Sequence, residues 1–342
     1  MKAFTLTEPY HSVLIDIPEP VPSKTDAILK LVRNGICGSD LNSYRGKNSY
    51  LSYPRIPGHE IVGEIVSIPK NTKDLSVGML VTCNPYFNCG HCYSCSRGFI
   101  NCCQQNETMG VQRDGAMKDF ISMPVERLIA GNGLSPDYLA LVEPFSIAYH
   151  GIKKAHIAKG DNVLIIGAGT IGMFAALSAK VFGANVFIAD IANDKLIFAS
   201  NHFTIDGTIL NDSTTHFNDQ VNKYTDGHGF DVVIEAAGTP STFQACIDAA
   251  AFCGKIIQIG ISNRTLDFNF TIIQKKELSI YGSRNATSED FEEVVSLFLK
   301  RNDWNLLSMI SATFPFLEAP EAFAFLDANT STLFKVMLKH YD

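Results

Sequence analysis

The sequence predicts an α/β protein with two domains, a mainly β domain and a domain built on a doubly wound parallel sheet. Residues 1–130 alternate short apolar runs with turn signals such as Pro18 and Gly35, which is typical of a compact, largely antiparallel fold. From Leu139 to about Gly282, near-continuous apolar runs alternate with helical stretches, as expected for parallel strands buried on both faces. The tail that follows is expected to fold back onto the first domain.

The predicted elements follow from these patterns in chain order. Two strands of the first domain are expected at 27–32 and 61–66. The parallel strands are expected at 163–166, 186–189, 232–236, 256–259 and 278–281, with helices at 172–182 and 241–252 between them, and a helix at 288–300 and a strand near 334–338 in the tail. The predicted domains are 1–148 with 285–342, and 149–284.

Composition limits the class of protein. The chain has 342 residues, of which 46% are hydrophobic and 18% charged, the profile of a globular protein. Its net charge is −7 and no basic run stands out, so nucleic acid is not an expected partner. The apolar runs are too short for a membrane span, and the N-terminus does not resemble a signal peptide, so we expect a cytoplasmic protein.

Four thiols mark one metal site. Cys89, Cys92, Cys95 and Cys103 follow at spacings of three, three and eight, and four sulfurs can fill every position around one tetrahedral zinc ion. Such a closed site holds a lobe in shape and does no chemistry. A disulfide loop or redox pair is the alternative, and Cys102 is a possible replacement for Cys103.

A glycine-rich turn marks a dinucleotide site of the Rossmann type. The run Val163–Ile166 leads into Gly167, Gly169 and Gly172, which permit a tight turn, a close approach to a pyrophosphate, and close packing of helix on strand. Asp190 follows at the end of the next strand, where it can bind a ribose 2′-hydroxyl and would repel a 2′-phosphate, so NAD is favoured over NADP. The remaining candidates for cofactor contact are Thr170, Ile171, Lys195, Ala237, Gly260 and Gly282.

Three further segments carry ligand-type residues: Gly35-Ile-Cys37-Gly-Ser39-Asp40, Pro57-Gly-His59-Glu60 and Leu141-Val-Glu143-Pro144. With the four-thiol loop and the glycine turn, their order and spacing resemble the zinc-containing medium-chain dehydrogenase/reductase family over essentially the whole chain. Within it, Glu143-Pro-Phe-Ser and Tyr44-Arg-Gly resemble the sorbitol, L-threonine and sugar-acid dehydrogenases, among them the L-galactonate and L-idonate 5-dehydrogenases. The resemblance implies a GroES-like catalytic domain beside the Rossmann domain.

The resemblance also implies a catalytic zinc bound by Cys37 and His59, with Glu60 and Glu143 competing for the third protein position. Zinc with one thiolate, one neutral imidazole and one carboxylate is formally neutral, whereas a second carboxylate makes the site negative. We therefore expect one glutamate to bind directly and the other to bind through the zinc water or in exchange. Since Glu60 follows His59 immediately, binding both requires a local irregularity in the strand.

The implied reaction oxidises an alcohol. Zinc lowers the pKa of the substrate hydroxyl, and hydride passes to the nicotinamide. Ser39 stands where the family uses a hydroxyl to pass the proton onward. Many relatives carry a histidine where this chain has Asn42, which cannot take up a proton, so Tyr44, water or a cofactor ribose hydroxyl would have to replace it.

Polar residues suggest the substrate. Tyr44, Arg113, Arg284 and Asn285 are the candidate substrate residues, because hydroxyl and guanidinium groups suit a polyol or a sugar acid better than a simple alcohol. An enzyme of the L-threonine 3-dehydrogenase kind is an alternative.

Two alternative hypotheses also fit parts of the sequence. One is a metal-free quinone-type reductase on the same scaffold, which Cys37, His59 and the thiol loop oppose. The other is a catalytically silent NAD-binding regulatory protein, which the absent histidine at position 42 permits. The expected assembly is a homotetramer or a homodimer.

Overall fold

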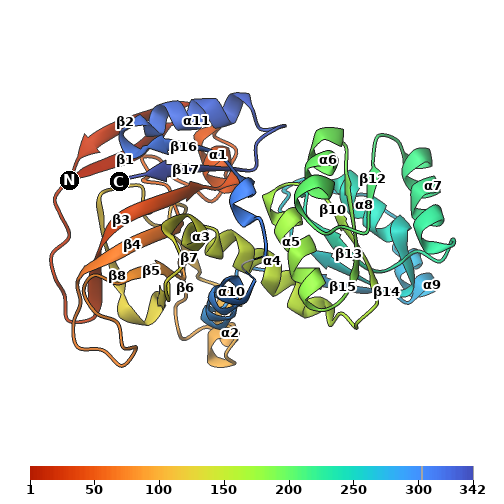
Figure 1. The fold of residues 1–342 in the computed structure, drawn as a ribbon, viewed down its shortest axis with the longest axis horizontal. Helices are drawn as coiled ribbons and strands as arrows, with labels where there is room; N and C mark the ends of the chain where they lie inside the picture. Colours follow the sequence, from red (N-terminus) through yellow and green to blue (C-terminus); the bar gives the residue numbers. More distant parts are fainter. Residues whose placement is uncertain (302, 342) are drawn as a thin grey trace. The chain divides into compact units, whose positions relative to one another are not determined.

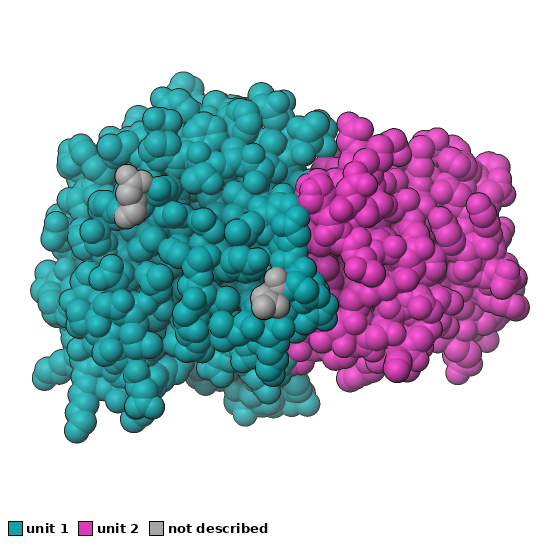
Figure 2. All heavy atoms as spheres, in the orientation of Figure 1, with its two compact units in different colours: residues 1–143, 286–342 teal, residues 144–285 magenta. Residues whose placement is uncertain are grey.

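A computed structural model describes residues 1–301 and 303–341, which form two compact units. Unit 1 consists of Met1–Glu143 and Ala286–Asp342, and unit 2 of Pro144–Asn285 (Figure 2). The two segments of unit 1 show that the C-terminal tail packs with the N-terminal half. These divisions fall after Glu143 and Asn285, a few residues from the predicted boundaries.

Unit 2 is a doubly wound sheet of six parallel strands (Figure 1). The strand order is β12-β11-β10-β13-β14-β15, so the order reverses at β10, and the turns after β10 and β13 lie at the switch point where such sheets bind ligands. The strands are β10 (Asn162–Ile166), β11 (Asn185–Asp190), β12 (Gly207–Leu210), β13 (Phe230–Glu235), β14 (Ala250–Gln258) and β15 (Ser279–Gly282); the helices are α4 (Val142–Ala155), α5 (Thr170–Val181), α6 (Asn193–His202), α7 (Thr214–Thr225), α8 (Pro240–Ala249) and α9 (Thr271–Lys276).

Close packing of α5 on the sheet depends on a glycine. A Cβ added at Gly172 would lie 1.7 Å from the carbonyl oxygen of Gly167, so no side chain fits there. The next residues of α5, from Met173 to Ala179, are buried against β10 and β11. The helix N-terminus is thereby fixed beside the glycine turn.

Unit 1 is mainly β. Its largest sheet has the order β16-β17-β3-β4-β5-β9, with β8 also paired to β3. The C-terminal strand β17 lies antiparallel to β3, with Val336 opposite Ile36, which brings the end of the chain beside its first long strand.

The elements of unit 1 are bounded as follows. The strands are β1 (Lys2–Glu8), β2 (His11–Asp16), β3 (Asp26–Ile36), β4 (Glu60–Ser67), β5 (Leu80–Cys83), β6 (Tyr86–Phe87), β7 (Glu107–Thr108), β8 (Phe120–Pro124), β9 (Leu128–Ala130), β16 (Ile310–Pro315) and β17 (Lys335–Lys339); the helices are α1 (Gly38–Tyr44), α2 (Tyr93–Ser96), α3 (Pro136–Ala140), α10 (Ser288–Lys300) and α11 (Ala319–Ala328), with short 3-10 turns at Ile100–Cys102, Val125–Arg127, Leu306–Met309 and Phe316–Glu318.

Unit 2 differs from the sequence expectations in two places. The helix expected at 241–252 ends at Ala249, and β14 begins at Ala250, because Ala250 pairs with Phe230 of the neighbouring strand. The edge strand β12 was not predicted. It is only four residues long and just one of them, Ile209, is fully buried, so it lacks the apolar run that marks the inner strands.

No helix in the described part of the chain is both long enough and apolar enough to cross a lipid bilayer.

The Gly172 contact predicts a stability effect. Replacing Gly172 with Ala should lower the free energy of unfolding by about 1–3 kcal/mol, the usual cost of overpacking, because the new methyl group collides with the Gly167 carbonyl. Urea unfolding measures it. Gly282→Ala is the matched control, since a Cβ there meets nothing within 4 Å. Equal stability of the two variants would contradict the packing described.

Candidate metal centres and cofactor site

The four predicted thiols of unit 1 form one cluster. The sulfur atoms of Cys89, Cys92, Cys95 and Cys103 lie within 4.8 Å of one another, and all four are free thiols. The backbone N–H groups of Cys89 and Gln105 donate to Cys103 Sγ at 3.2 and 3.3 Å, and that of Cys92 donates to Cys89 Sγ at 3.3 Å. Such donors stabilise thiolates, so the cluster fits a closed tetrahedral zinc site.

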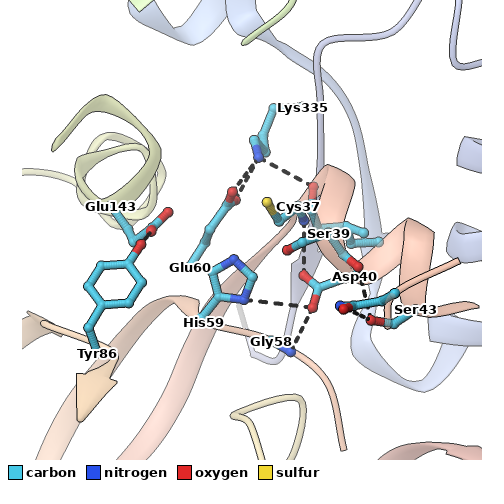
Figure 3. A network of polar contacts seen from close by, with 12 residues as sticks. Cys37, Ser39, Asp40, Ser43, Gly58, His59, Glu60, Tyr86, Glu143 and Lys335 are labelled. Carbon is cyan, nitrogen blue, oxygen red and sulfur yellow. Dashed lines mark hydrogen bonds and ion pairs between the residues drawn. The ribbon is translucent and has the colours of Figure 1, made fainter. Parts of the chain in front are cut away.

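A second cluster of ligand atoms comprises Cys37, His59 and Glu60, also within 4.8 Å of one another (Figure 3). Cys37 precedes the first turn of α1, and Glu60 begins β4. His59 lies just before that strand, after Gly58, whose φ of +101° is in the left-handed region. This turn is the local irregularity that lets two successive side chains face one point.

The backbone around Glu60 leaves room for its carboxylate. A Cβ added at Gly35 on the paired strand β3 would lie 2.0 Å from Glu60 Oε2. Only glycine at position 35 therefore permits this carboxylate to lie beside Cys37. The donor set, one sulfur, one imidazole and one carboxylate, fits zinc with a position open for substrate.

Lys335 is the cation of this site. Its Nζ donates to both oxygens of Glu60 at 2.6 and 2.7 Å and to the Ile36 carbonyl at 3.3 Å. Both side chains are buried, at 3% and 0% exposure. Burial alone would lower the pKa of Lys335, but the negative charges of Glu60 and Cys37 outweigh it and the pKa is raised. Lys335 therefore remains protonated.

Lys335 changes the charge balance expected from the sequence. A bound Zn²⁺ and Lys335 would together carry three positive charges, which equal the three negative charges of a Cys37 thiolate and of Glu60 and Glu143 when both carboxyls are ionised; the count leaves out Asp40, which lies behind His59. With Lys335 included, both carboxylates are compatible with a formally neutral set. Charge alone therefore does not exclude the second glutamate.

Asp40 supports His59 from behind. Its side chain is fully buried and accepts the N–H groups of Cys37 at 3.0 Å and Gly58 at 3.2 Å, which ties the two ligand-bearing turns together. Its Oδ1 lies 3.7 Å from His59 Nδ1. This distance is longer than a hydrogen bond, but the ring nitrogen faces the Asp40 carboxyl, so the other ring nitrogen is left for a metal.

Glu143 is the last residue of the first segment of unit 1 and lies in the first turn of α4, of which only Val142 and Glu143 belong to that unit. Its Oε1 accepts a hydrogen bond from the Tyr86 hydroxyl, and both side chains are buried (Figure 3). Burial raises the pKa of Glu143 to about 7, and the charge of Glu60 adds to this, although His59 and Lys335 oppose it. Glu143 lies outside the group formed by Cys37, His59 and Glu60.

In unit 2 the glycine turn has the features that the sequence predicted. Gly167 has a φ of +109°, and a Cβ there would lie 3.0 Å from the backbone nitrogen of Ala237. Asp190 accepts the N–H of Ala168 at 2.6 Å and of Ala192 at 2.8 Å, so it links the glycine turn to the end of β11. Gly169 caps the N-terminus of α5, and Thr170 and Ile171 begin that helix. Lys195 lies in the first turn of α6, Gly260 packs against Gly238, and Gly282 ends β15.

Two of the predicted substrate residues make aromatic contacts within unit 1. The Tyr44 ring packs against Phe323 and Tyr10 in the core of unit 1, with ring centroids 5.7 and 5.4 Å away. The Arg113 guanidinium stacks 3.7 Å from the Phe87 ring. The predicted proton-relay residue Ser39 is half-buried in the first turn of α1, beside Cys37 (Figure 3), and Asn42 is exposed on the same helix. Arg284 and Asn285 follow β15 in unit 2.

Sequence reasoning missed the residues that support the ligands. No sequence pattern indicates a role for Lys335, Tyr86 or Asp40. Two local patterns hint weakly at burial: Lys335 stands within the apolar run Phe334–Leu338, and Asp40 is followed directly by Leu41. Tyr86 carries no local signal beyond its place shortly before the thiol loop.

Comparison with known proteins identifies the family. Residues 170–300 match the family model described as zinc-binding dehydrogenase, and residues 23–132 match that of the alcohol dehydrogenase GroES-like domain. The chain is 34% identical over 304 residues to L-galactonate-5-dehydrogenase of Escherichia coli K12, covering 89% of this chain and 88% of the relative. It is 31% identical over 348 residues to sorbitol dehydrogenase of Halalkalibacterium halodurans, covering 100% of both.

A solved structure agrees in fold. The alcohol dehydrogenase RspB of Escherichia coli CFT073, determined in complex with NADH, superposes with a TM-score of 0.91 at 29% identity and covers 99% of each chain. The fold class expected from the sequence, a Rossmann sheet with a discontinuous GroES-like domain, is confirmed. The chain belongs to the zinc-binding alcohol dehydrogenase family and is an oxidoreductase.

The buried ion pair predicts a stability effect. Lys335→Met should lower the free energy of unfolding by about 3–5 kcal/mol, because it leaves the Glu60 carboxylate buried without a partner. Chemical denaturation of the metal-free protein measures it. The double variant Glu60→Gln with Lys335→Met should recover most of the loss. If the double variant loses as much unfolding free energy as the two single variants together, the ion pair is not the source of the stability loss.

The thiol cluster predicts a pH dependence of metal content. Burial raises the pKa of Cys95 to about 11, whereas hydrogen bonding from the Gln104 backbone lowers that of Cys92 to about 6. Because zinc must displace thiol protons, its affinity should fall as pH falls. Titration against a chelator from pH 8 to pH 5 measures it. An affinity independent of pH would contradict thiolate ligation.

Proposed function

We propose that this enzyme oxidises a secondary alcohol of a polyol or sugar acid, of the galactonate, idonate, gulonate or sorbitol type, using NAD and a catalytic zinc. The observation that carries the proposal is the cluster of Cys37, His59 and Glu60 in a chain that also holds the glycine turn with Asp190. Neither feature alone specifies the chemistry, since a fold does not establish a function.

In the proposed site, Cys37, His59 and Glu60 hold the metal. Each Glu60 oxygen keeps a lone pair beyond its contact with Lys335, so the ion pair and metal binding are compatible. Bound zinc would supply a Lewis acid that stabilises negative charge on the substrate oxygen. Lys335 holds Glu60 in place, Asp40 orients His59, and Glu143 faces the position left for substrate or water.

NAD is the proposed cofactor. Asp190 lies at the end of β11, and each of its oxygens, although already accepting one backbone N–H, can accept a ribose hydroxyl as well. Its negative charge would repel the 2′-phosphate of NADP. Ala237 beside Gly167, and Gly260 beside Gly238, are the proposed contacts around the switch point.

The substrate class is inferred from polarity and from relatives. The second carboxylate beside the proposed metal ligands, and the named relatives, a galactonate and a sorbitol dehydrogenase, favour a polyhydroxylated substrate. The alternative of an L-threonine dehydrogenase fits the same metal site. A silent NAD-binding regulator would keep the thiol cluster and the glycine turn, but it gives no reason for the buried Glu60–Lys335 pair beside Cys37.

A homodimer or homotetramer is proposed on the exposed edge of the parallel sheet. Strand β15 is the last strand of that sheet, and Ile280 and Tyr281 are each 37% exposed along it. An unpaired edge with apolar side chains can pair with its copy about a two-fold axis. The cytoplasmic location stays a prediction.

A substrate panel tests the proposal. NADH absorbance should show oxidation of one or more of sorbitol, galactonate, idonate and gulonate at rates well above those with ethanol, with NAD preferred over NADP. Asp190→Ala should lower the ratio of kcat/KM with NAD to kcat/KM with NADP, because it removes the negative charge that opposes a 2′-phosphate.

Three other outcomes of the substrate panel would contradict parts of the proposal. A preference for ethanol would overturn the substrate class, and a preference for L-threonine would support the alternative enzyme. Binding of NAD without NADH formation on any compound would support the regulator.

A further inference from the structure

Tyr86 is a buried residue that makes a direct contact with the candidate catalytic site. Its side chain is 8% exposed, and its hydroxyl donates to Glu143 Oε1. Figure 3 shows the second oxygen of Glu143 pointing away from Tyr86, toward the side where Glu60 lies. The phenol therefore occupies one oxygen of the carboxylate and leaves the other for the metal site.

The backbone of Tyr86 is held on both sides. Its N–H donates to Asn84 Oδ1 at 3.0 Å, and Asn84 in turn donates to Ser288 Oγ at 3.2 Å. Its carbonyl accepts a hydrogen bond from Arg127 Nη1 at 2.7 Å. A side chain with a fixed backbone and a buried ring loses little freedom when it makes one more hydrogen bond, so the contact with Glu143 is well defined.

The same backbone lies at the base of the four-thiol lobe, which is the segment 88–106 between β6 and β7. Tyr86 belongs to β6, which pairs with β7, and the register places Tyr86 opposite Thr108. The four thiols lie in the chain between these two short strands, so metal binding at the thiols closes a loop whose ends are β6 and β7. A closed metal loop restricts its own ends.

Side chains continue this connection. Arg127, which holds the Tyr86 carbonyl, also donates through Nη2 to Asn88 Oδ1 at 2.9 Å. Asn88 Nδ2 lies 3.9 Å from Cys95 Sγ, within hydrogen-bonding distance of sulfur. Thus Cys95, Asn88, Arg127, Tyr86 and Glu143 form one continuous set of polar contacts between the thiol cluster and the second carboxylate.

We infer that Tyr86 is a positioning residue for the catalytic metal site, and that the four-thiol lobe holds Tyr86 in place. Tyr86 fixes the Glu143 carboxylate so that a single oxygen faces the ligands Cys37, His59 and Glu60. Through Tyr86, metal binding at the four thiols would also influence the geometry of the catalytic metal site. The inference rests on the proposed function for the identity of the site. Removing a side chain that holds a metal ligand in this way commonly lowers metal affinity or activity by about 10–100-fold.

Tyr86→Phe tests the first half, because it removes the hydroxyl and keeps the ring. The protein is loaded with cobalt, and the visible absorption and the chelator-competed affinity of each site are measured with kcat and KM. We expect weaker metal binding at the Cys37 site by about 10–100-fold, an altered cobalt spectrum there, and a lower kcat with KM little changed.

Tyr138→Phe is the matched control. Tyr138 also lies in unit 1, and its hydroxyl donates to the Trp304 carbonyl at 3.3 Å, away from the metal ligands. It should leave the cobalt spectrum and both affinities unchanged. If Tyr86→Phe matches this control in spectrum, affinity and kcat, the inference is wrong, even if its melting temperature is lower.

A second pair of variants tests the link to the lobe. Asn88→Ala keeps all four thiols but removes the contacts to Arg127 and Cys95. It should shift the cobalt spectrum of the Cys37 site in the same direction as Tyr86→Phe, and the double variant should show less than the sum of the two effects. An unchanged spectrum in Asn88→Ala, or strictly additive effects, would overturn the link.

These readouts separate the inference from the proposed function. If the wild-type enzyme oxidises no polyol or sugar acid, the proposed function fails, whereas metal affinity and the cobalt spectrum still decide the role of Tyr86. If polyol oxidation is found and Tyr86→Phe changes neither readout, only the inference fails.

Discussion

The buried contact between Glu60 and Lys335 is the interaction on which the candidate metal centre depends. Burying a carboxylate at 0% exposure is costly unless a cation accompanies it, and Lys335 supplies one at 2.6 Å. The pair also joins distant parts of unit 1, since Glu60 begins β4 and Lys335 begins the C-terminal strand β17. The C-terminal tail is therefore part of the site.

The remaining supports serve the same end from other directions. Asp40 ties the Cys37 turn to the Gly58 turn and faces His59, while Gly35 leaves the space that the Glu60 carboxylate fills. On the opposite side Tyr86 restrains Glu143. The ligands themselves are few, but they are useful only because buried groups around them fix their direction and charge.

The sequence predicted features that depend on local spacing. The cluster of Cys89, Cys92, Cys95 and Cys103, the packing at Gly172 and the place of Asp190 follow from residues near one another in the chain, and the structure brings each together as expected. The alternation of apolar runs likewise predicted the parallel sheet. The assignment of these residues to metal and cofactor stays a prediction.

Features set by tertiary register could not be predicted. Lys335 is 275 positions from Glu60 and meets it only because β17 pairs with β3. Tyr86 is 57 positions from Glu143. Tyr44 was expected at the substrate, but its ring belongs to an apolar core that includes residues of α11, which no local pattern around position 44 reveals.

X-ray absorption at the zinc edge of the zinc-loaded enzyme tests the central claim most directly. We expect two zinc ions per chain, one bound by four sulfurs and the other by one sulfur together with nitrogen and oxygen. The average is then about 2.5 sulfur ligands per zinc. A single zinc per chain with four sulfurs, or an average of four, would contradict a metal held by Cys37, His59 and a glutamate.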